Sequence, residues 1–257
     1  MKIDGIDGRW WEPVHFSNLK HMAECAELYQ WHCTHDDPET AWARIGLAFH
    51  SRVLGGLEVV CFEGRRDPRS REWQDFQREH SGSEILIASE YRVVAGMVES
   101  VMRHPIASSL LARCPIREEK ITGTLIGFEC EGRIDFRGPG LLGELKSDTV
   151  VRPDRWQRRV QYMGYPAQLD WYRTLLNSPN PEECYSIVVG KAPPHLVVVH
   201  HATERLLEDG RRAWRLWLEQ LRVCADSGVW PGYSESIVEW DSAELEQGEA
   251  VEWEEAS

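Results

Sequence analysis

Apolar side chains recur every three or four residues along several stretches of the chain, the spacing that places them on one face of a helix. One such stretch carries Trp42, Ile45, Phe49 and Val53. Pro166 suits the first turn of a later helix, because its missing N–H is not needed there. The pattern predicts helices over residues 17–32, 37–53, 89–103, 107–113, 153–162, 166–176 and 204–226.

Short apolar runs with alternating polar positions predict strands, mainly in the second half of the chain. The strand expected at 141–146 is apolar on both faces, which is typical of a strand covered on both sides. Helices and strands in this order favour an α/β fold, in which helices flank a central mixed β-sheet. The predicted strands are a hairpin over 116–137, with a turn or bulge at 122–124, and single strands at 141–146, 184–190 and 196–200.

The length of 257 residues fits one domain, which we expect over residues 1–240. Apolar residues make up 42% of the chain, enough for a sizeable core. The last segment, 241–257, differs because it contains seven acidic residues and no basic one. A segment of one charge sign usually stays solvated, so we expect an unpacked acidic tail.

The formal net charge of −13 argues against a protein that wraps nucleic acid by bulk charge. Seven cysteines, none in a Cys-x-x-Cys pair, disfavour a disulfide framework or a zinc finger. A reducing cytoplasm is the simplest location for such a chain. No run of about 18 apolar residues indicates a membrane span, and no N-terminal apolar segment indicates export.

The stretch 132–147 carries the densest set of candidate catalytic side chains. Asp135 lies on one predicted strand, and Glu144 and Lys146 lie on the next, on the face opposite to Leu145. Carboxylate oxygens suit Mg²⁺ or Mn²⁺, and a lysine beside such an ion can steady a water molecule or a phosphate. A Glu-x-Lys pair alone is more often a solvated ion pair, so both interpretations stay open here.

Three further side chains are candidates with ordinary alternatives. His50 lies beside an apolar helix face, where a histidine is usually a satisfied core residue. Gln168 and Tyr172 are four residues apart and share a helix face. Such a pair is often only an exposed helix edge.

Residues 62–80 are polar and rich in arginine, and predict a surface loop followed by a short helix. Arg65 and Arg66 belong to this stretch, and Arg158 and Arg159 form a second basic cluster. These side chains either cover a solvated face or contact DNA phosphates.

Four motifs in one order resemble those of the RecB-type nucleases of the PD-(D/E)xK superfamily. They are Gly-Leu-Ala-Phe-His50, Gly-Arg-Ile-Asp135, Glu144-Leu-Lys146 and Gln168-Leu-Asp-Trp-Tyr172. The surrounding sequence is most similar to the RecE-like, exonuclease VIII-type recombination exonucleases of phages and prophages. That wider resemblance spans roughly residues 16–235 and includes the stretches 17–20, 143–147, 164–165, 191–194 and 230–233.

The resemblance implies a restriction-endonuclease-like core with a divalent-metal site, which a second metal ion could join to stabilise the leaving oxygen. His50, Asp135 and Glu144 would ligate Mg²⁺ or Mn²⁺, with the main-chain carbonyl of Leu145 as a further ligand. Lys146 would orient or deprotonate the attacking water.

Gln168 and Tyr172 would then steer that water and the scissile phosphate, and Tyr172 would also contact DNA. Glu118 or Glu119 could add another acidic group, and Glu119 is the residue we expect in this role.

The resemblance also implies a reaction and its partners. Such enzymes degrade linear double-stranded DNA from the 5′ end and leave 3′ overhangs for a RecT-like single-strand annealing protein. They act as homo-oligomeric rings, trimers or tetramers, in the cytoplasm.

Two other functions remain to be compared. One is an iron–sulfur nuclease of the CRISPR-associated or repair-linked kind, which needs a late cysteine cluster, whereas only Cys184 and Cys224 follow the motifs. The other is an inactive DNA-binding or assembly module, which would normally have lost the acids or the lysine.

Overall fold

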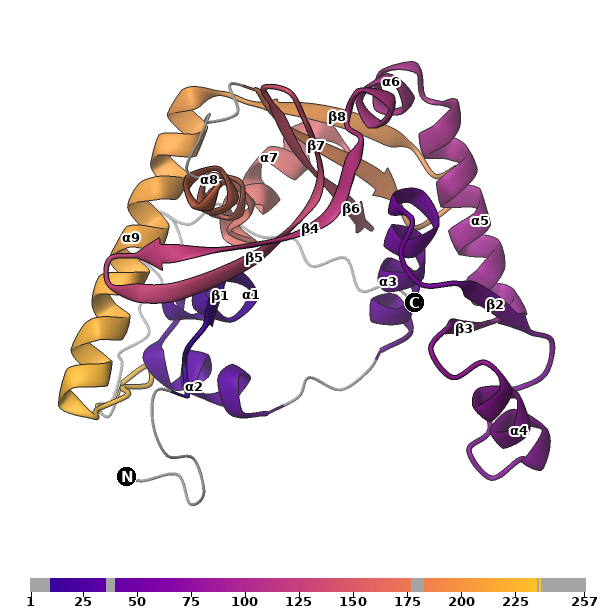
Figure 1. Ribbon diagram of the computed structural model, residues 1–257, viewed down its shortest axis with the longest axis horizontal. Coiled ribbons are helices and arrows are strands. Elements are labelled where there is room, and N and C mark those ends of the chain that lie inside the picture. Colours follow the sequence, from indigo (N-terminus) through magenta and orange to yellow (C-terminus); the bar gives the residue numbers. More distant parts are fainter. Residues whose placement is uncertain (1–9, 36–39, 177–182, 235, 237–257) are drawn as a thin grey trace.

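The computed structural model describes residues 10–35, 40–176, 183–234 and 236. Its centre is a six-stranded sheet in the order β1-β5-β6-β7-β8, with β4 paired to β5 (Figure 1). β4, β5 and β6 are antiparallel to one another in turn, whereas β6 and β7 are parallel. The sheet is therefore mixed, as predicted. Its strands are β1 (Val14–His15), β4 (Ile116–Leu125), β5 (Phe128–Gly138), β6 (Leu141–Asp148), β7 (Glu183–Gly190) and β8 (Val197–Ala202).

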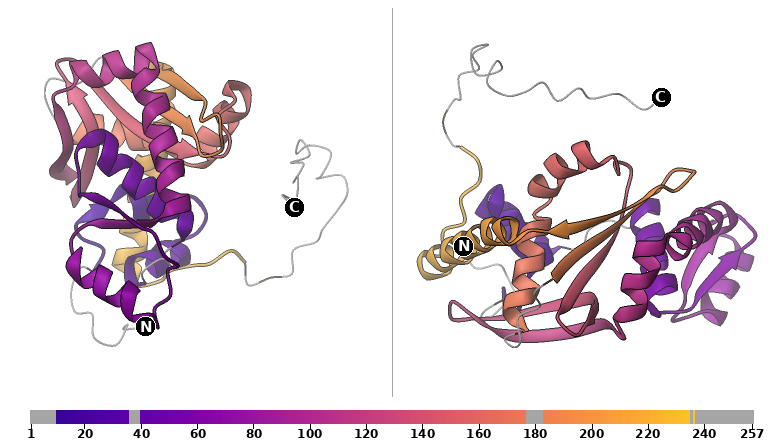
Figure 2. Two further views of the ribbon diagram at one scale, coloured as in Figure 1. Left: turned by 90° about the vertical axis from the view of Figure 1, so that its right-hand side faces the viewer. Right: turned by 90° about the horizontal axis from the view of Figure 1, so that it is seen from above.

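Helices cover both faces of this sheet, and Figure 2 shows the sheet between the two groups. One group packs with the sheet around the core that contains Leu142, and the other packs around the core that contains Leu145. The first group is α1 (Phe16–Leu19), α2 (Ala26–Thr34), α8 (Tyr165–Leu175) and α9 (Glu204–Ser227). The second group is α3 (Ala41–Leu54), α5 (Ala88–Arg103) and α6 (Pro105–Arg113).

The alternation of side chains along β6 decides which face carries chemistry. Leu141 and Leu145 belong to the core of α3 and α5, and Leu142 belongs to the core of α8 and α9. Glu144 and Lys146 follow Leu142 at steps of two, so they lie on the α8 side. α7 (Pro153–Tyr162) connects β6 to α8 and buries Trp156.

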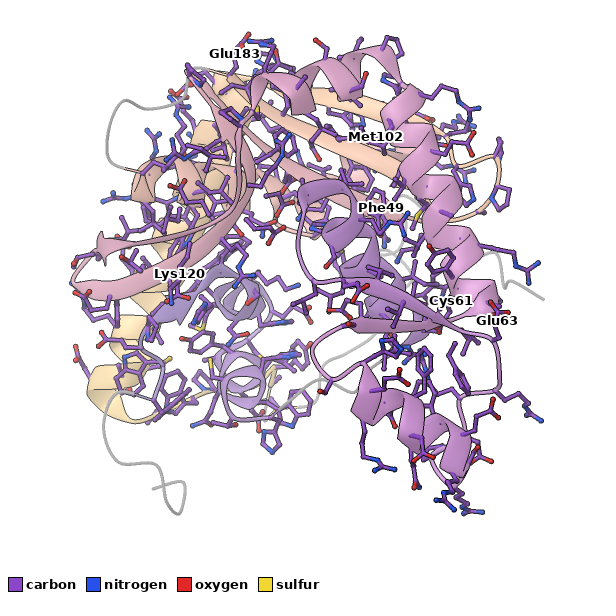
Figure 3. All side chains as sticks on the ribbon, turned by 45° about the vertical axis from the view of Figure 1, so that its right-hand side comes forward. Phe49, Cys61, Glu63, Met102, Lys120 and Glu183 are labelled. Carbon is purple, nitrogen blue, oxygen red and sulfur yellow. The ribbon has the colours of Figure 1, made fainter. Side chains whose placement is uncertain are left out.

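A small unit projects from the end of the molecule opposite α9 (Figure 1). It consists of β2 (Val59–Phe62), α4 (Arg71–Glu79) and β3 (Glu84–Ile87), with the two strands parallel. Figure 3 shows Cys61 and Glu63 in this unit, far from Lys120 of the β4–β5 hairpin. The sequence pattern predicted its loop and helix but not its four-residue strands, which are too short to show alternation.

Three other expectations were wrong. The helix predicted at 17–32 is broken, because a 3₁₀ turn (Lys20–Ala23) and an extended Cys25 separate α1 from α2. The apolar helix face that carries Trp42 predicts burial, but Trp42 is 50% exposed. Residues 122–124 lie inside β4, and the hairpin turns at Ile126 and Gly127, both with positive φ.

The expected helix start at 37–38 and the acidic tail at 241–257 lie outside the described residues. Among the described helices, none is long and apolar enough to cross a membrane.

Candidate active site

The site lies where β5 and β6 separate. Their ladder ends at the pair Phe136–Gly143, and a side chain on Gly143 would collide with the Phe136 ring. Beyond this pair, Asp135 Oδ2 accepts a hydrogen bond of 2.6 Å from the backbone N–H of Leu145. The carboxylate of Asp135 therefore bridges the fork between the two strands.

Three possible metal ligands converge beside this fork. His50 Nδ1 lies 3.9 Å from Glu118 Oε1 and 3.9 Å from Asp135 Oδ2. Their ligand atoms all lie within 4.8 Å of one another. His50 reaches the fork because Ile45 and Phe49 are buried and fix the rotation of α3. One imidazole and two carboxylates form a donor set that fits Mn²⁺ or Mg²⁺.

Glu118, rather than the expected Glu119, lies beside His50 and Asp135. Glu118 has a φ of +47°, and its neighbours in the ladder place it opposite Asp135. Glu119 instead accepts hydrogen bonds from Arg137, one of them 2.7 Å long. This pairing lowers the pKa of Glu119 and leaves its carboxylate outside the cluster.

Glu144 lies deeper than the three clustered ligands. Its side chain is 2% exposed, and Oε2 is 3.3 Å from Lys146 Nζ. Burial raises the pKa of Glu144, and the ammonium of Lys146 opposes this rise. Glu144 is thus turned toward Lys146 and is not one of the clustered residues, contrary to the predicted grouping with His50 and Asp135.

A chain of hydrogen bonds runs from Lys146 to α8. Lys146 Nζ donates to Gln168 Oε1 at 2.9 Å, and Gln168 Nε2 donates to the Tyr172 hydroxyl at 2.9 Å. Lysine can only donate, so the amide oxygen must face it and the amide nitrogen must face the phenol. The Tyr172 hydroxyl therefore keeps its own proton available for a further acceptor.

The protonation states make Lys146 and Tyr172 donors. Burial alone would lower the pKa of Lys146, but the carboxylates of Glu144 and Asp135 outweigh it and raise that pKa. Burial raises the pKa of Tyr172 to about 12. At neutral pH both groups hold their protons, which favours orienting a water molecule or a phosphate over removing a proton.

The close approach of Tyr172 explains why Gly132, in the Gly-Arg-Ile-Asp motif, is a glycine. A side chain at Gly132 would lie 2.6 Å from Cε1 of Tyr172. The bare backbone therefore lets the phenol ring pack against β5 while its hydroxyl reaches Gln168.

The four expected DNA-binding arginines differ in their surroundings. Arg66 pairs with the buried Glu90 at 3.0 Å, and Arg159 pairs with the buried Asp148 at 2.8 Å. Arg65 and Arg158 are exposed. Two of the four side chains thus hold the fold together, whatever else they contact.

This difference predicts that substitutions of the adjacent residues Arg65 and Arg66 change the stability of the protein to different extents. Arg66→Ala should lower the free energy of unfolding by about 1–3 kcal/mol, because Glu90 loses one of its two charged donors. Arg65→Ala should leave it within about 0.5 kcal/mol of the wild type. Urea unfolding of both variants measures this, and equal stability would show that the Arg66–Glu90 pair contributes nothing.

The pKa of His50 predicts how metal binding depends on pH. Burial alone would lower this pKa, but the carboxylates of Asp135 and Glu118 outweigh it and raise the pKa above 6.5. A cation must displace the proton, so Mn²⁺ affinity should fall up to tenfold per pH unit below that pKa. Calorimetry in buffers of different ionisation enthalpy should detect the released proton. An Mn²⁺ affinity that does not change between pH 6 and pH 8 would contradict this prediction.

Several solved structures align with this chain. A provisionally assigned exonuclease from Eubacterium rectale aligns with a TM-score of 0.62 and 12% identity, over 91% of each chain. An alkaline exonuclease from Laribacter hongkongensis aligns with a TM-score of 0.30 and 14% identity, over 69% of this chain and 93% of that one. A search of curated proteins found no match.

One family profile covers nearly the whole described chain. It matches residues 15–241, which include the fork, the clustered ligands and α8. The chain therefore belongs to the family described as the PDDEXK-like domain of unknown function (DUF3799).

Proposed function

We propose that this protein is a divalent-metal-dependent deoxyribonuclease. The observation that carries the proposal is the position of two sets of groups around one fork. His50, Glu118 and Asp135 form a ligand cluster, and Lys146 next to them begins the hydrogen-bonded chain to Tyr172. Hydrolysis of a phosphodiester needs both a cation site and donors for the phosphate oxygens.

The residues divide the work by their chemistry. A bound Mg²⁺ or Mn²⁺ would supply Lewis acidity toward the phosphate and lower the pKa of a water ligand. His50, Glu118 and Asp135 would hold that cation, and Glu144 and the Leu145 carbonyl are further candidate ligands. Lys146 places a positive charge beside the phosphate, and Tyr172 donates a hydrogen bond to the water or to a phosphate oxygen.

The finer assignment is a 5′-to-3′ exonuclease of linear double-stranded DNA. The stretches around the motifs, which resemble those of RecE-like enzymes, support this choice. The 3′ overhangs would serve a RecT-like annealing protein in recombination, and the active form would be a ring of three or four copies in the cytoplasm. Arg65 and Arg158 are exposed and suit phosphate contacts.

Digestion of end-labelled duplexes tests the activity and its direction together. We expect linear duplex to disappear with Mn²⁺ or Mg²⁺, with the 5′ label released first and a covalently closed circle left intact. Release of the 3′ label first would reverse the polarity. Intact linear DNA with either metal would favour the inactive DNA-binding module.

A further inference from the structure

A cavity of about 320 Å³ lies under α7, directly behind Glu144. Its size is at the lower end of the range for small-molecule sites, roughly 300–1,000 Å³. It is bounded by α7, the N-terminal ends of α8 and α9, and strands β6 to β8. Glu144, Trp156, Val160, Tyr165, Ser186 and His200 are among the residues that line it.

The floor of this cavity is a row of polar side chains across three strands. Glu144 on β6 pairs in register with Ser186 on β7, and Ser186 pairs with His200 on β8. Residues opposite one another in a ladder project from the same face. An acid, a hydroxyl and an imidazole therefore stand side by side under one helix.

Two of the polar groups around this cavity lack a hydrogen-bond partner in the described structure. The Trp156 indole nitrogen and Nε2 of His200 are buried without one. Glu144 interacts with the Ser186 hydroxyl and with Lys146, its ion-pair partner. Ser186 and Trp156 are 7% and 1% exposed. Each buried polar group without a partner costs about 1–3 kcal/mol, so such a group points to a ligand.

The cavity adjoins the reacting centre. Lys146 Nζ is 3.3 Å from the Glu144 carboxylate and 4.8 Å from the centroid of the Tyr165 ring, and both residues line the cavity. A phosphate held by Lys146 would therefore have its attached sugar and base within reach of the floor. The carboxylate accepts hydrogen bonds only, which favours a base with amino or imino donors.

We propose that this cavity is a nucleoside subsite, which takes the base and sugar of the nucleotide whose phosphate contacts Lys146. The inference rests on the proposed nuclease function and names where the released nucleotide sits. α7 forms the cover, and Trp156 is its one buried residue.

Calorimetric titration of deoxyguanosine 5′-monophosphate, with inorganic phosphate as the comparison, tests the subsite. Guanine offers amino and imino donors to the floor, and phosphate alone reports on Lys146. With Mg²⁺ present, we expect the nucleotide to bind at least roughly tenfold more tightly than phosphate. Val160→Trp should fill the cavity and remove that gain while phosphate binding stays unchanged.

A pair of buried serines gives a matched control. Ser186→Ala should weaken nucleotide binding roughly two- to tenfold, the value of one hydrogen bond. Ser100→Ala, at a serine 9% exposed on α5, should have no effect. If Val160→Trp fails to fold, Leu206→Trp fills the cavity from its opposite wall.

Two results would overturn the inference. One is equal affinity for the nucleotide and for phosphate in the wild type, and the other is full nucleotide affinity in both cavity-filling variants. Digestion of linear duplex by the same preparation separates this from the proposed function. If the protein cuts DNA but binds the nucleotide no more tightly than phosphate, only the proposed subsite is wrong. If it binds the nucleotide more tightly but does not cut DNA, only the proposed nuclease function is wrong.

Discussion

Lys146→Ala should abolish DNA cleavage while leaving Mn²⁺ binding nearly intact. The lysine is protonated between Glu144 and Gln168, so its contribution is a fixed charge and a donor beside the phosphate. Loss of one such donor costs roughly 100- to 1,000-fold in rate. Cleavage of labelled duplex and calorimetric titration with Mn²⁺ give the two quantities.

Lys120→Ala is the matched control for this variant. Lys120 lies on the β4–β5 hairpin (Figure 3). It pairs with Glu131 at 2.7 Å. It should cleave like the wild type. The Lys146→Ala variant also leaves the buried Glu144 without its charged partner, so its free energy of unfolding should fall by about 3 kcal/mol. Its assays should therefore be run well below its Tm. Equal loss of cleavage and of Mn²⁺ affinity would refute the assigned role.

Asp135→Asn should remove both metal binding and cleavage. The amide oxygen can still accept the hydrogen bond from Leu145 N–H, so the fork should keep its geometry while one ligand charge disappears. Mutating a residue that only hydrogen-bonds a metal ligand lowers metal affinity roughly 10- to 100-fold. Because Asp135 is itself a proposed ligand, Mn²⁺ affinity should fall at least that far. Calorimetry and duplex cleavage measure the two losses.

The adjacent acids of β4 supply the control for Asp135→Asn. Glu118→Gln should weaken Mn²⁺ binding, because Glu118 lies in the cluster. Glu119→Gln should leave it unchanged, because Glu119 pairs with Arg137 outside the cluster. If Glu119→Gln weakened Mn²⁺ binding as much as Glu118→Gln, the cluster would be assigned to the wrong acid.

The choice between these two acids shows what the sequence pattern could not determine. A turn at Ile126 and Gly127 places Glu118 opposite Asp135, whereas a turn at 122–124 gives a different register. Polarity and glycine at 122–124 suggested a turn, but Gly123 lies within β4. An error of a few residues in one turn thus changes every cross-strand pair.

The chemistry of β6 was easier to predict. Glu144 and Lys146 share a face because of the two-residue period of any strand, and the structure places them 3.3 Å apart. The bounds of α7 and the start of α8 also follow from proline and glycine at 153, 164 and 166. These features depend on local geometry and need no knowledge of distant contacts.

Long-range features were not predictable from local pattern. The polar row of Glu144, Ser186 and His200 depends on the registers of β6 with β7 and of β7 with β8. The residue pattern of a single strand does not determine these registers. The exposure of Trp42 has the same origin, because helical spacing gives a stripe but not its width. The ion pair of Arg66 with Glu90 is likewise a long-range contact that the local sequence does not predict.

The position of the cation is the central claim, and anomalous diffraction from crystals grown with Mn²⁺ measures it directly. We expect one strong peak ligated by His50 Nδ1, Glu118 and Asp135. A peak elsewhere, with these three side chains unligated and the ion bound by other residues, would contradict the site.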